Sequence, residues 1–148
     1  MRRLYLIALL FWMSGYVWPE EVRTLVLAAS TRSTIPPLTV QEARKLFLGI
    51  PVDKNGAAVI PILNTSDPLL YEVFLQKVTY MSSSAYETQL VSTVFRMGGK
   101  RPGNFSDAKT LAEALRKNPN SVTYLWQDQA QKLAGVKAVS VLWTGSTE

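Results

Sequence analysis

The stretch Ala57–Phe74, "AAVIPILNTSDPLLYEVF", joins a strand, a polar loop and a helix start. Its first part, Ala57–Leu63, is a short apolar run typical of a buried strand, and Pro61 favours a strand end or an unpaired position. Apolar residues recur at helical spacing from Pro68 onward, which predicts a helix. Residues 64–67 are therefore a strand-to-helix loop, the part of α/β proteins that commonly holds ligands.

Two interpretations of this loop stay open. Asp67 stands directly before Pro68, so its carboxylate can cap the helix and the proline suits the first turn. A helix N-terminus also attracts anions, and Thr65 and Ser66 could add hydroxyl donors. A capping carboxylate repels most anions. It could help only by accepting a hydrogen bond from a protonated oxyanion such as hydrogen phosphate.

The rest of the chain alternates strand and helix signals. Strands are expected at 23–30, 57–63, 122–126 and 136–143. Helices are expected to begin near Thr39, Pro68, Ser84, Ser106 and Gln127. Long helical connections between strands indicate an α/β fold with a mixed, mostly parallel sheet of about four strands covered by helices.

Capping boxes support two of these helices. Thr39 with Glu42, and Ser84 with Glu87, have the spacing in which a hydroxyl and a carboxylate each satisfy a backbone donor. The helix after Ser84 is expected to continue through the apolar residues Leu90, Val91, Val94 and Phe95 and to end at Gly98–Gly99.

A second polar loop, Ala29–Thr34, follows the first expected strand. It offers the hydroxyls of Ser30, Thr31 and Ser33 and the guanidinium of Arg32. If its strand neighbours the strand before Asn64, the two loops face one edge and form an oxyanion pocket. The alternative is a polar loop that is simply solvated.

Arg96, Lys100 and Arg101 form the one local cluster of cations, around two glycines after a helix. In one interpretation, these cations simply interact favourably with the dipole at the helix C-terminus. The functional alternative is a basic patch for an acidic protein partner.

Composition excludes several classes of function. The 148 residues include no cysteine and no histidine, so thiol catalysis, the usual zinc sites and Ser-His-Asp chemistry are excluded. No Ser-Lys spacing indicates hydrolysis, so we expect a protein that is not an enzyme and has neither a cofactor nor a metal. Without residues 1–19 and their two arginines, the formal charge of +5 falls to +3, which is too mild to indicate nucleic-acid binding.

The first nineteen residues are expected to be a secretory signal. Arg2 and Arg3 precede the apolar run Leu4–Met13, which is short for a spanning helix. Cleavage after residue 19 would lower the net charge from +5 to +3 and leave a periplasmic domain, 23–144, with no membrane span. An uncleaved N-terminal anchor is the alternative.

Three segments carry a resemblance to a known family. They are "IPPLTVQEARKLFLG" (35–49), "NTSDPLLYEVFLQKV" (64–78) and "VFRMGGKRP" (94–102). Together, over roughly Leu25 to Trp143, they resemble small single-domain relatives of the phosphate-binding proteins of ABC transporters. The resemblance implies a single periplasmic-binding-protein-like lobe that binds an oxyanion, phosphate above all, at helix N-termini.

The chain departs from that family at the ligand loop. Full-length receptors carry an Arg-x-Asp-Gly-Ser-Gly-Thr type of motif, and the equivalent place here is Leu63–Leu69, "LNTSDPL". The Arg and the Ser-Gly-Thr are missing, so only Thr65, Ser66 and Asp67 carry over. The leading hypothesis is therefore phosphate or similar oxyanion binding without catalysis. The alternative is an envelope interaction or signalling module that keeps the fold and has lost the ligand.

Overall fold

The computed structural model describes residues 15–16 and 20–147. The expected signal peptide falls outside these residues except for Gly15 and Tyr16. In chain order the elements are β1 (Val22–Ser30), α1 (Val40–Phe47), β2 (Asp53–Lys54), β3 (Ala57–Ala58), β4 (Ile60–Asn64), α2 (Pro68–Phe74), the π-helix η1 (Leu75–Thr79), α3 (Ser83–Met97), β5 (Gly103–Phe105), α4 (Ala108–Lys117), β6 (Ser121–Trp126), α5 (Gln127–Lys132) and β7 (Val136–Ser146).

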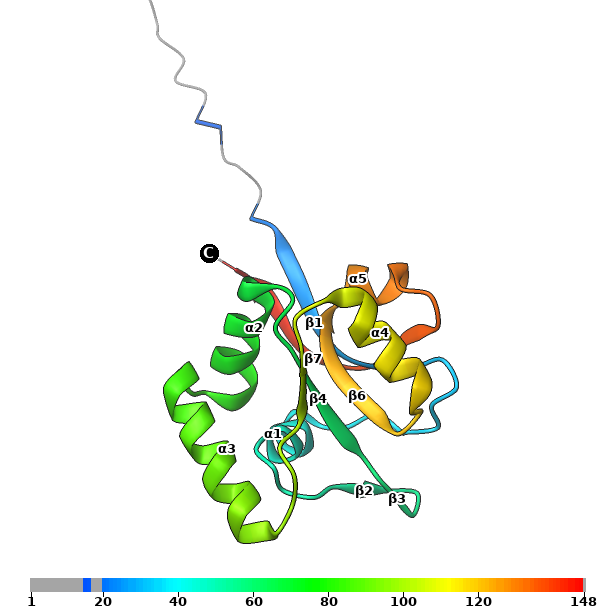
Figure 1. Ribbon diagram of the computed structural model, residues 1–148. Helices are drawn as coiled ribbons and strands as arrows, with labels where there is room; N and C mark the ends of the chain where they lie inside the picture. Colours follow the sequence, from blue (N-terminus) through cyan, green and yellow to red (C-terminus); the bar gives the residue numbers. More distant parts are fainter. Residues whose placement is uncertain (1–14, 17–19, 148) are drawn as a thin grey trace, which may run out of the picture.

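Five strands form the main sheet in the order β5-β4-β6-β1-β7 (Figure 1). β4 runs parallel to β5 and β6, while β1 is antiparallel to both β6 and β7. Four strands thus point one way and β1 points the other. The expected α/β fold with a mixed, mostly parallel sheet is confirmed, with β5 as a strand that the sequence did not indicate.

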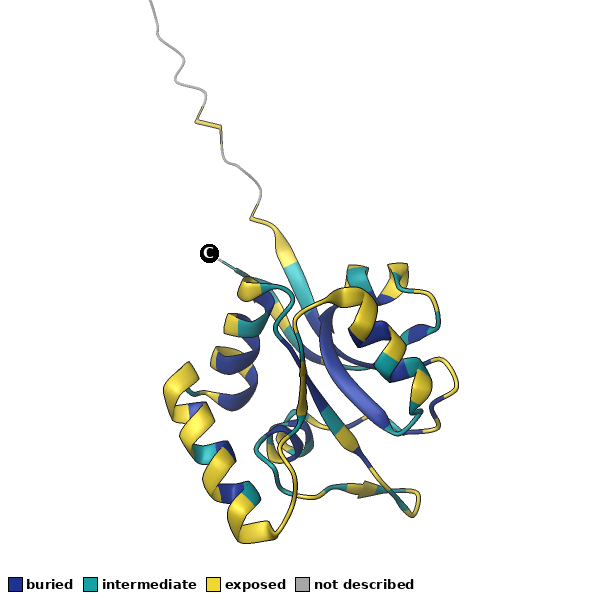
Figure 2. Ribbon diagram, viewed as in Figure 1, coloured by how far each residue is buried: buried dark blue, intermediate teal, exposed yellow. Residues whose placement is uncertain are grey.

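Helices cover both faces of the sheet (Figure 2). Successive residues of a strand point to opposite faces, so both faces carry apolar side chains that pack against helices. One face packs against α1, α2, η1 and α3, and its largest fully buried side chains are aromatic: Phe47, Phe74, Tyr86, Tyr124 and Trp126. The other face packs against α4 and α5 through aliphatic residues: Val26, Ala28, Ile62, Leu111, Ala112, Leu115, Leu125, Ala130 and Val136. Each face therefore buries its own layer of core.

The strand expected at 57–63 is divided in two. Asn55 and Gly56 have φ of 52° and 77°, the left-handed backbone of a tight hairpin turn, so Ala57–Ala58 pairs with Asp53–Lys54. The main-sheet strand begins only at Ile60. Pro61 lies at the start of this strand, beside Val122 of β6.

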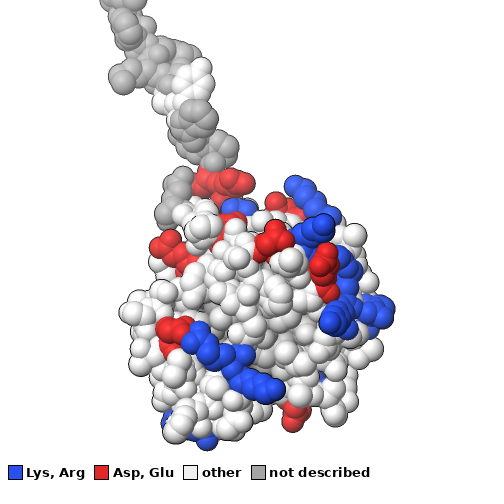
Figure 3. Space-filling model, in the orientation of Figure 1, with Lys and Arg blue, Asp and Glu red and all other residues white. Residues whose placement is uncertain are grey.

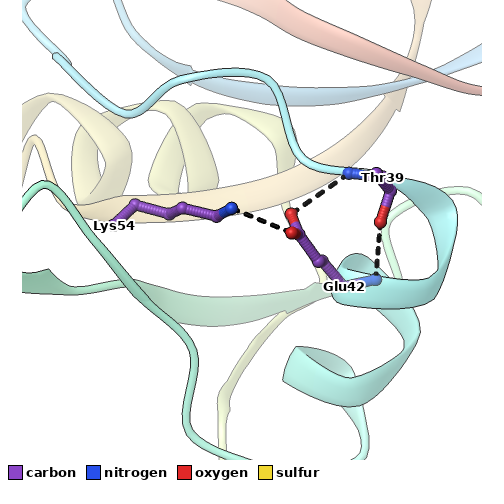
Figure 4. A network of polar contacts seen from close by, with 3 residues as sticks. All are labelled: Thr39, Glu42 and Lys54. Carbon is purple, nitrogen blue, oxygen red and sulfur yellow. Dashed lines mark hydrogen bonds and ion pairs between the residues drawn. The ribbon is translucent and has the colours of Figure 1, made fainter.

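The capping box at Thr39 and Glu42 is confirmed (Figure 4). The Glu42 N–H donates to the Thr39 hydroxyl at 3.1 Å, and the Thr39 N–H donates to a Glu42 carboxylate oxygen at 3.3 Å. Lys54 donates to the other carboxylate oxygen at 2.8 Å, and this hydrogen bond lowers the pKa of Glu42. The helix start is thereby tied to the β2–β3 hairpin.

Two other expected caps are wrong by a residue or two. α3 is capped by Ser82, which accepts from the Ala85 N–H, because Ser84 is already helical. Glu87 is then free of the capping box and forms an ion pair with Arg101. In α4 the cap is Asp107 rather than Ser106, because the helix begins at Ala108 and the Asp107 carboxylate accepts from the Thr110 N–H at 3.0 Å.

The apolar residues of α3 divide between the core and the surface. Leu90 is fully buried, but Val91 is 47% exposed and Phe95 is 88% exposed. The buried positions are Tyr86, Leu90 and Thr93. A helix this apolar on several sides did not reveal which side would face the core.

Candidate functional site

The two polar loops that were predicted to form one pocket lie at opposite ends of the strands of the sheet. Ala29, near the carboxyl end of β1, pairs with Val122, which also pairs with Pro61 at the amino end of β4. Asn64 ends β4 at the far edge. The expected neighbourhood is therefore wrong, because β6 stands between β1 and β4 and β1 runs antiparallel.

Asn64 organises the loop at the carboxyl end of β4. Its side-chain oxygen accepts from the Ser66 N–H at 3.0 Å and from the Ser66 hydroxyl at 2.6 Å. Its side-chain amide donates to the Tyr124 carbonyl at 3.2 Å. The Tyr124 hydroxyl accepts from the Asn64 N–H at 3.1 Å and donates to the Asn64 carbonyl at 2.8 Å. Asn64 is fully buried, so this network anchors the loop in the core.

Thr65 ties the loop to the edge strand β5. Its N–H donates to the Phe105 carbonyl at 2.9 Å, and its hydroxyl donates to the side-chain oxygen of Asn104 at 2.8 Å. The strand that sequence patterns did not indicate is thus one wall of the candidate site.

Asp67 is a cap and a core contact at the same time. One carboxylate oxygen accepts from the N–H groups of Leu69 and Leu70 at 3.0 and 3.2 Å, and the other accepts from the Trp126 indole at 3.1 Å. The next helical N–H, that of Tyr71, donates to the Asp67 carbonyl at 3.0 Å. The residue between cap and amides is a proline, which has no N–H. The first-turn amides that could bind an anion are therefore occupied by protein acceptors.

Arg23 is the cation at this edge, and sequence reasoning missed it. Its guanidinium lies over the Trp126 ring, 3.9 Å from the centroid, and the same indole contacts Asp67. The antiparallel course of β1 brings its amino end to the edge where β4 and β6 end. Glu21 and Asp128 line the same surface depression as Arg23 and temper its positive charge.

The other predicted loop clamps the opposite side of the molecule. Arg32 donates to the carbonyl of Arg116, and the Arg116 side chain donates to the Ala134 carbonyl at 2.8 Å. The hydroxyls of Ser30 and Ser33 accept from backbone N–H groups two residues later. The bonds of Arg32 and Arg116 join the loop after β1 to the end of α4 and to the segment after α5, whereas the serine bonds are local to the loop.

Within this loop, the Thr31 N–H donates to the Gly135 carbonyl at 2.9 Å, and its side chain is exposed. The hydrogen bonds of Ser30, Thr31, Arg32 and Ser33 are thus structural ones, far from Thr65, Ser66 and Asp67. Ligand binding at any of these residues stays a prediction.

The basic residues Arg96, Lys100 and Arg101 are exposed at the C-terminal end of α3 and in the segment after it. Arg101 pairs with Glu87, which holds the pKa of Arg101 above its ordinary value. On the face drawn in Figure 3, basic and acidic side chains alternate and large areas carry neither. The surface drawn there is not a broad basic field.

Some chemistries find no support among the described residues. Within 15–16 and 20–147, no three Asp or Glu side chains gather closely enough to hold a metal ion. In the same part of the chain, no helix is long and apolar enough to cross a bilayer.

Solved structures of phosphate-transport proteins share this fold. The chain resembles PstS from Borrelia burgdorferi with a TM-score of 0.58 at 15% identity, over 82% of this chain and 48% of that one. A candidate phosphate ABC transporter substrate-binding protein from Clostridium perfringens, solved with bound phosphate, gives 0.50 at 14% identity, over 80% and 44%. An ABC-type phosphate transport receptor from Vibrio cholerae gives 0.49 at 12%, over 80% and 46%.

The likenesses to the Borrelia burgdorferi and Clostridium perfringens structures establish the fold. The chain is a structural relative of phosphate-binding ABC transporter proteins and has the fold of a single lobe of that architecture. It spans less than half the length of those proteins. No family model matches the sequence, and a comparison with curated proteins finds no significant relative.

Proposed function

We propose that this protein is a non-catalytic binding lobe that holds a protonated oxyanion of the phosphate type at the loop Asn64–Asp67. The observation that carries the proposal is the position of this loop. Two hydroxyls and a carboxylate gather where the parallel strands β4 and β6 end and α2 begins. Fold relatives named for phosphate transport, one of them with phosphate bound, support the choice of ligand.

Binding would require one local rearrangement. The Ser66 hydroxyl turns from the Asn64 side chain toward the anion, and Asp67 accepts a hydrogen bond from the proton of the anion. Arg23 adds positive charge from β1. The amides of the first helical turn are already used, so we expect weak binding, with a Kd on the order of 1 mM.

Isothermal titration and amide NMR of the processed protein with phosphate and with sulfate test this proposal. Phosphate should bind and sulfate should not, because sulfate carries no proton for Asp67 at neutral pH. Ser66→Ala should weaken phosphate binding, and the exposed Lys132→Ala should leave it unchanged. Asp67→Asn should reduce the preference for phosphate over sulfate. Absence of heat and of shift changes near the loop at tens of millimolar phosphate would refute the proposal.

The second candidate is an interaction module that keeps the fold without a ligand. The hydrogen bonds of the loop favour it. The Thr65 and Ser66 hydroxyls, the first-turn amides and both Asp67 oxygens already have partners inside the protein. The contact surface in this case would include Arg96, Lys100 and Arg101. A pull-down from envelope extract with the triple alanine variant tests it, and a partner that survives the triple change would exclude this patch.

The location of the mature protein belongs to the same proposal. We place it in the periplasm, released from a signal peptide by cleavage near residue 19, because a basic start and a short apolar run precede the folded domain. Cell fractionation with mass spectrometry of the mature N-terminus tests this. A protein retained at full length in the membrane would support the anchor instead.

A further inference from the structure

The outer face of α3 is unusually apolar for a surface helix. Phe95 is 88% exposed and Val91 is 47% exposed, while Tyr86 and Leu90 on the inner face are fully buried. Val91 and Phe95 are one helical turn apart and line the same two shallow depressions. Single exposed apolar residues need no explanation, but a contiguous patch marks an interaction surface.

The residues around this patch have a symmetric order. The larger depression is lined by Glu87, Thr88, Val91, Ser92, Phe95 and Arg96. The intervals between these six positions are the same whether they are counted from Glu87 to Arg96 or from Arg96 to Glu87. An antiparallel second helix of the same sequence therefore places each position opposite a defined position of the set.

The chemistry of the opposed positions is complementary. Glu87 lies opposite Arg96 of the second copy, so opposite charges meet at both ends. Thr88 lies opposite Phe95, so a small side chain meets the largest one. The remaining pair, Val91 and Ser92, lies at the centre. Charge and size thus both match when the patch meets itself in the antiparallel direction.

We propose that two copies of this protein associate through the outer faces of α3, packed antiparallel about a two-fold axis between Val91 and Ser92. Such an interface uses the same patch on both subunits. Glu87 would then lie between Arg101 of its own chain and Arg96 of the second copy. Lys100 remains at the solvent-exposed rim.

A second copy fits this surface better than a partner of one charge sign. A purely acidic partner would place like charge against Glu87, and a purely apolar partner would bury Arg96 without a counter-ion. α3 has 15 residues and is about 22 Å long. One helix pair buries less area than a standard interface of about 1,600 Å², so the dimer is weak and concentration-dependent.

Sedimentation velocity of the processed protein, from micromolar to near-millimolar concentration, tests the proposal. Wild type should shift from monomer to dimer. Phe95→Ser should remain monomeric. Lys109→Glu, an exposed charge reversal on α4 on the other face of the sheet, is the matched control and should behave as wild type. Circular dichroism and thermal unfolding confirm that each variant is folded.

A charge swap tests the antiparallel register itself. Glu87→Arg alone and Arg96→Glu alone should each weaken self-association about tenfold, because like charges then meet twice across the axis. An equimolar mixture of these two variants should form a dimer again, since each arginine now meets a glutamate. A monomeric wild type, a dimer unaffected by Phe95→Ser, or a mixture that stays monomeric would each overturn the proposal. Dimerisation through α3 is independent of oxyanion binding at the loop.

Discussion

The two faces of the sheet are packed in different ways. The face under α1, α2 and α3 is built from aromatic rings, and the face under α4 and α5 is built from aliphatic side chains. The aromatic layer carries polar atoms into the core: the hydroxyls of Tyr86 and Tyr124 and the indole nitrogen of Trp126. The aliphatic face instead buries small hydroxyls such as that of Thr123, which lies on the same side of β6 as Leu125 and donates to the Ile62 carbonyl at 2.8 Å.

This difference decides how the candidate loop is held. The Tyr124 ring stacks on Phe74 with centroids 3.8 Å apart, and its hydroxyl bonds to the backbone of Asn64. The Trp126 indole donates to Asp67. The loop is therefore an extension of the aromatic core, and its polar groups stabilise the fold before they can serve a ligand.

The largest expected difference between the two faces is a loss of stability at alkaline pH, because the aromatic layer contains two buried tyrosines. Burial raises the pKa of Tyr86, and burial also raises the pKa of Tyr124 well above its usual value of 10.0. The folded state keeps both hydroxyls protonated. Their contribution to the free energy of unfolding is therefore fully present below about pH 10 and is lost as the pH rises above it. Each group can remove about 1.4 kcal/mol per pH unit in that range.

Urea unfolding across the alkaline range measures this loss. Tyr86→Phe should be less stable at neutral pH, because the hydrogen bond to the Phe47 carbonyl is lost, but its stability should fall less steeply with pH. An equal slope in wild type and variant would show that this hydroxyl does not control alkaline unfolding.

Large-to-small substitutions in the two layers should differ in whether they also affect the candidate loop. Phe74→Ala should lower the free energy of unfolding by about 3–5 kcal/mol, and Leu115→Ala on the other face by about 2–5 kcal/mol. Only Phe74→Ala should also speed amide exchange of Ser66 and Leu69, because Tyr124 loses its stacking partner. Faster exchange at the loop in Leu115→Ala would remove the distinction between the layers.

Tyr124→Phe isolates the polar contact from the packing. The ring is kept, but the buried N–H and carbonyl of Asn64 lose their partner. We expect a loss of about 2–3 kcal/mol in urea unfolding. A loss below about 0.5 kcal/mol would mean that other groups or water satisfy this backbone, and the loop would be less tied to the core than its hydrogen bonds indicate.

The smallest expected effect compares two caps. Asp67→Ala should cost about 1–2 kcal/mol, because two amides lose their cap and the Trp126 indole loses its acceptor. Asp107 caps α4 on the aliphatic side, where its carboxylate accepts from the Thr110 N–H, and Asp107→Ala should cost about 0.5–1 kcal/mol. Thermal and urea unfolding of both variants measure the difference, and equal losses would show that the indole bond adds nothing.

Some features could be predicted from local sequence with good accuracy. The capping box at Thr39 and Glu42 and the cap at Asp67 were both evident, because each depends on a few adjacent residues. Where two capping residues stand side by side, as with Ser106 and Asp107, local sequence could not choose.

The candidate site was predictable only in its parts. The loop at Thr65, Ser66 and Asp67 was located correctly at a strand end that leads into a helix. Its companions were not. Sequence patterns suggested Arg32, which lies at the opposite edge, and gave no sign of Arg23 or of Asn104. These partners depend on strand order and direction, which involve residues far apart in the chain.

The sequence by itself determined which segments form most of the helices and the longer strands, which residues are apolar, and which loop has hydroxyls and a carboxylate beside a helix start. Such features follow from backbone preferences and side-chain periodicity over a few residues. Only the tertiary structure decided that β1 runs antiparallel to β6 and that β6 separates β1 from β4. It thereby decided which polar groups meet, because strand pairing is a long-range choice made by the packing of the whole sheet.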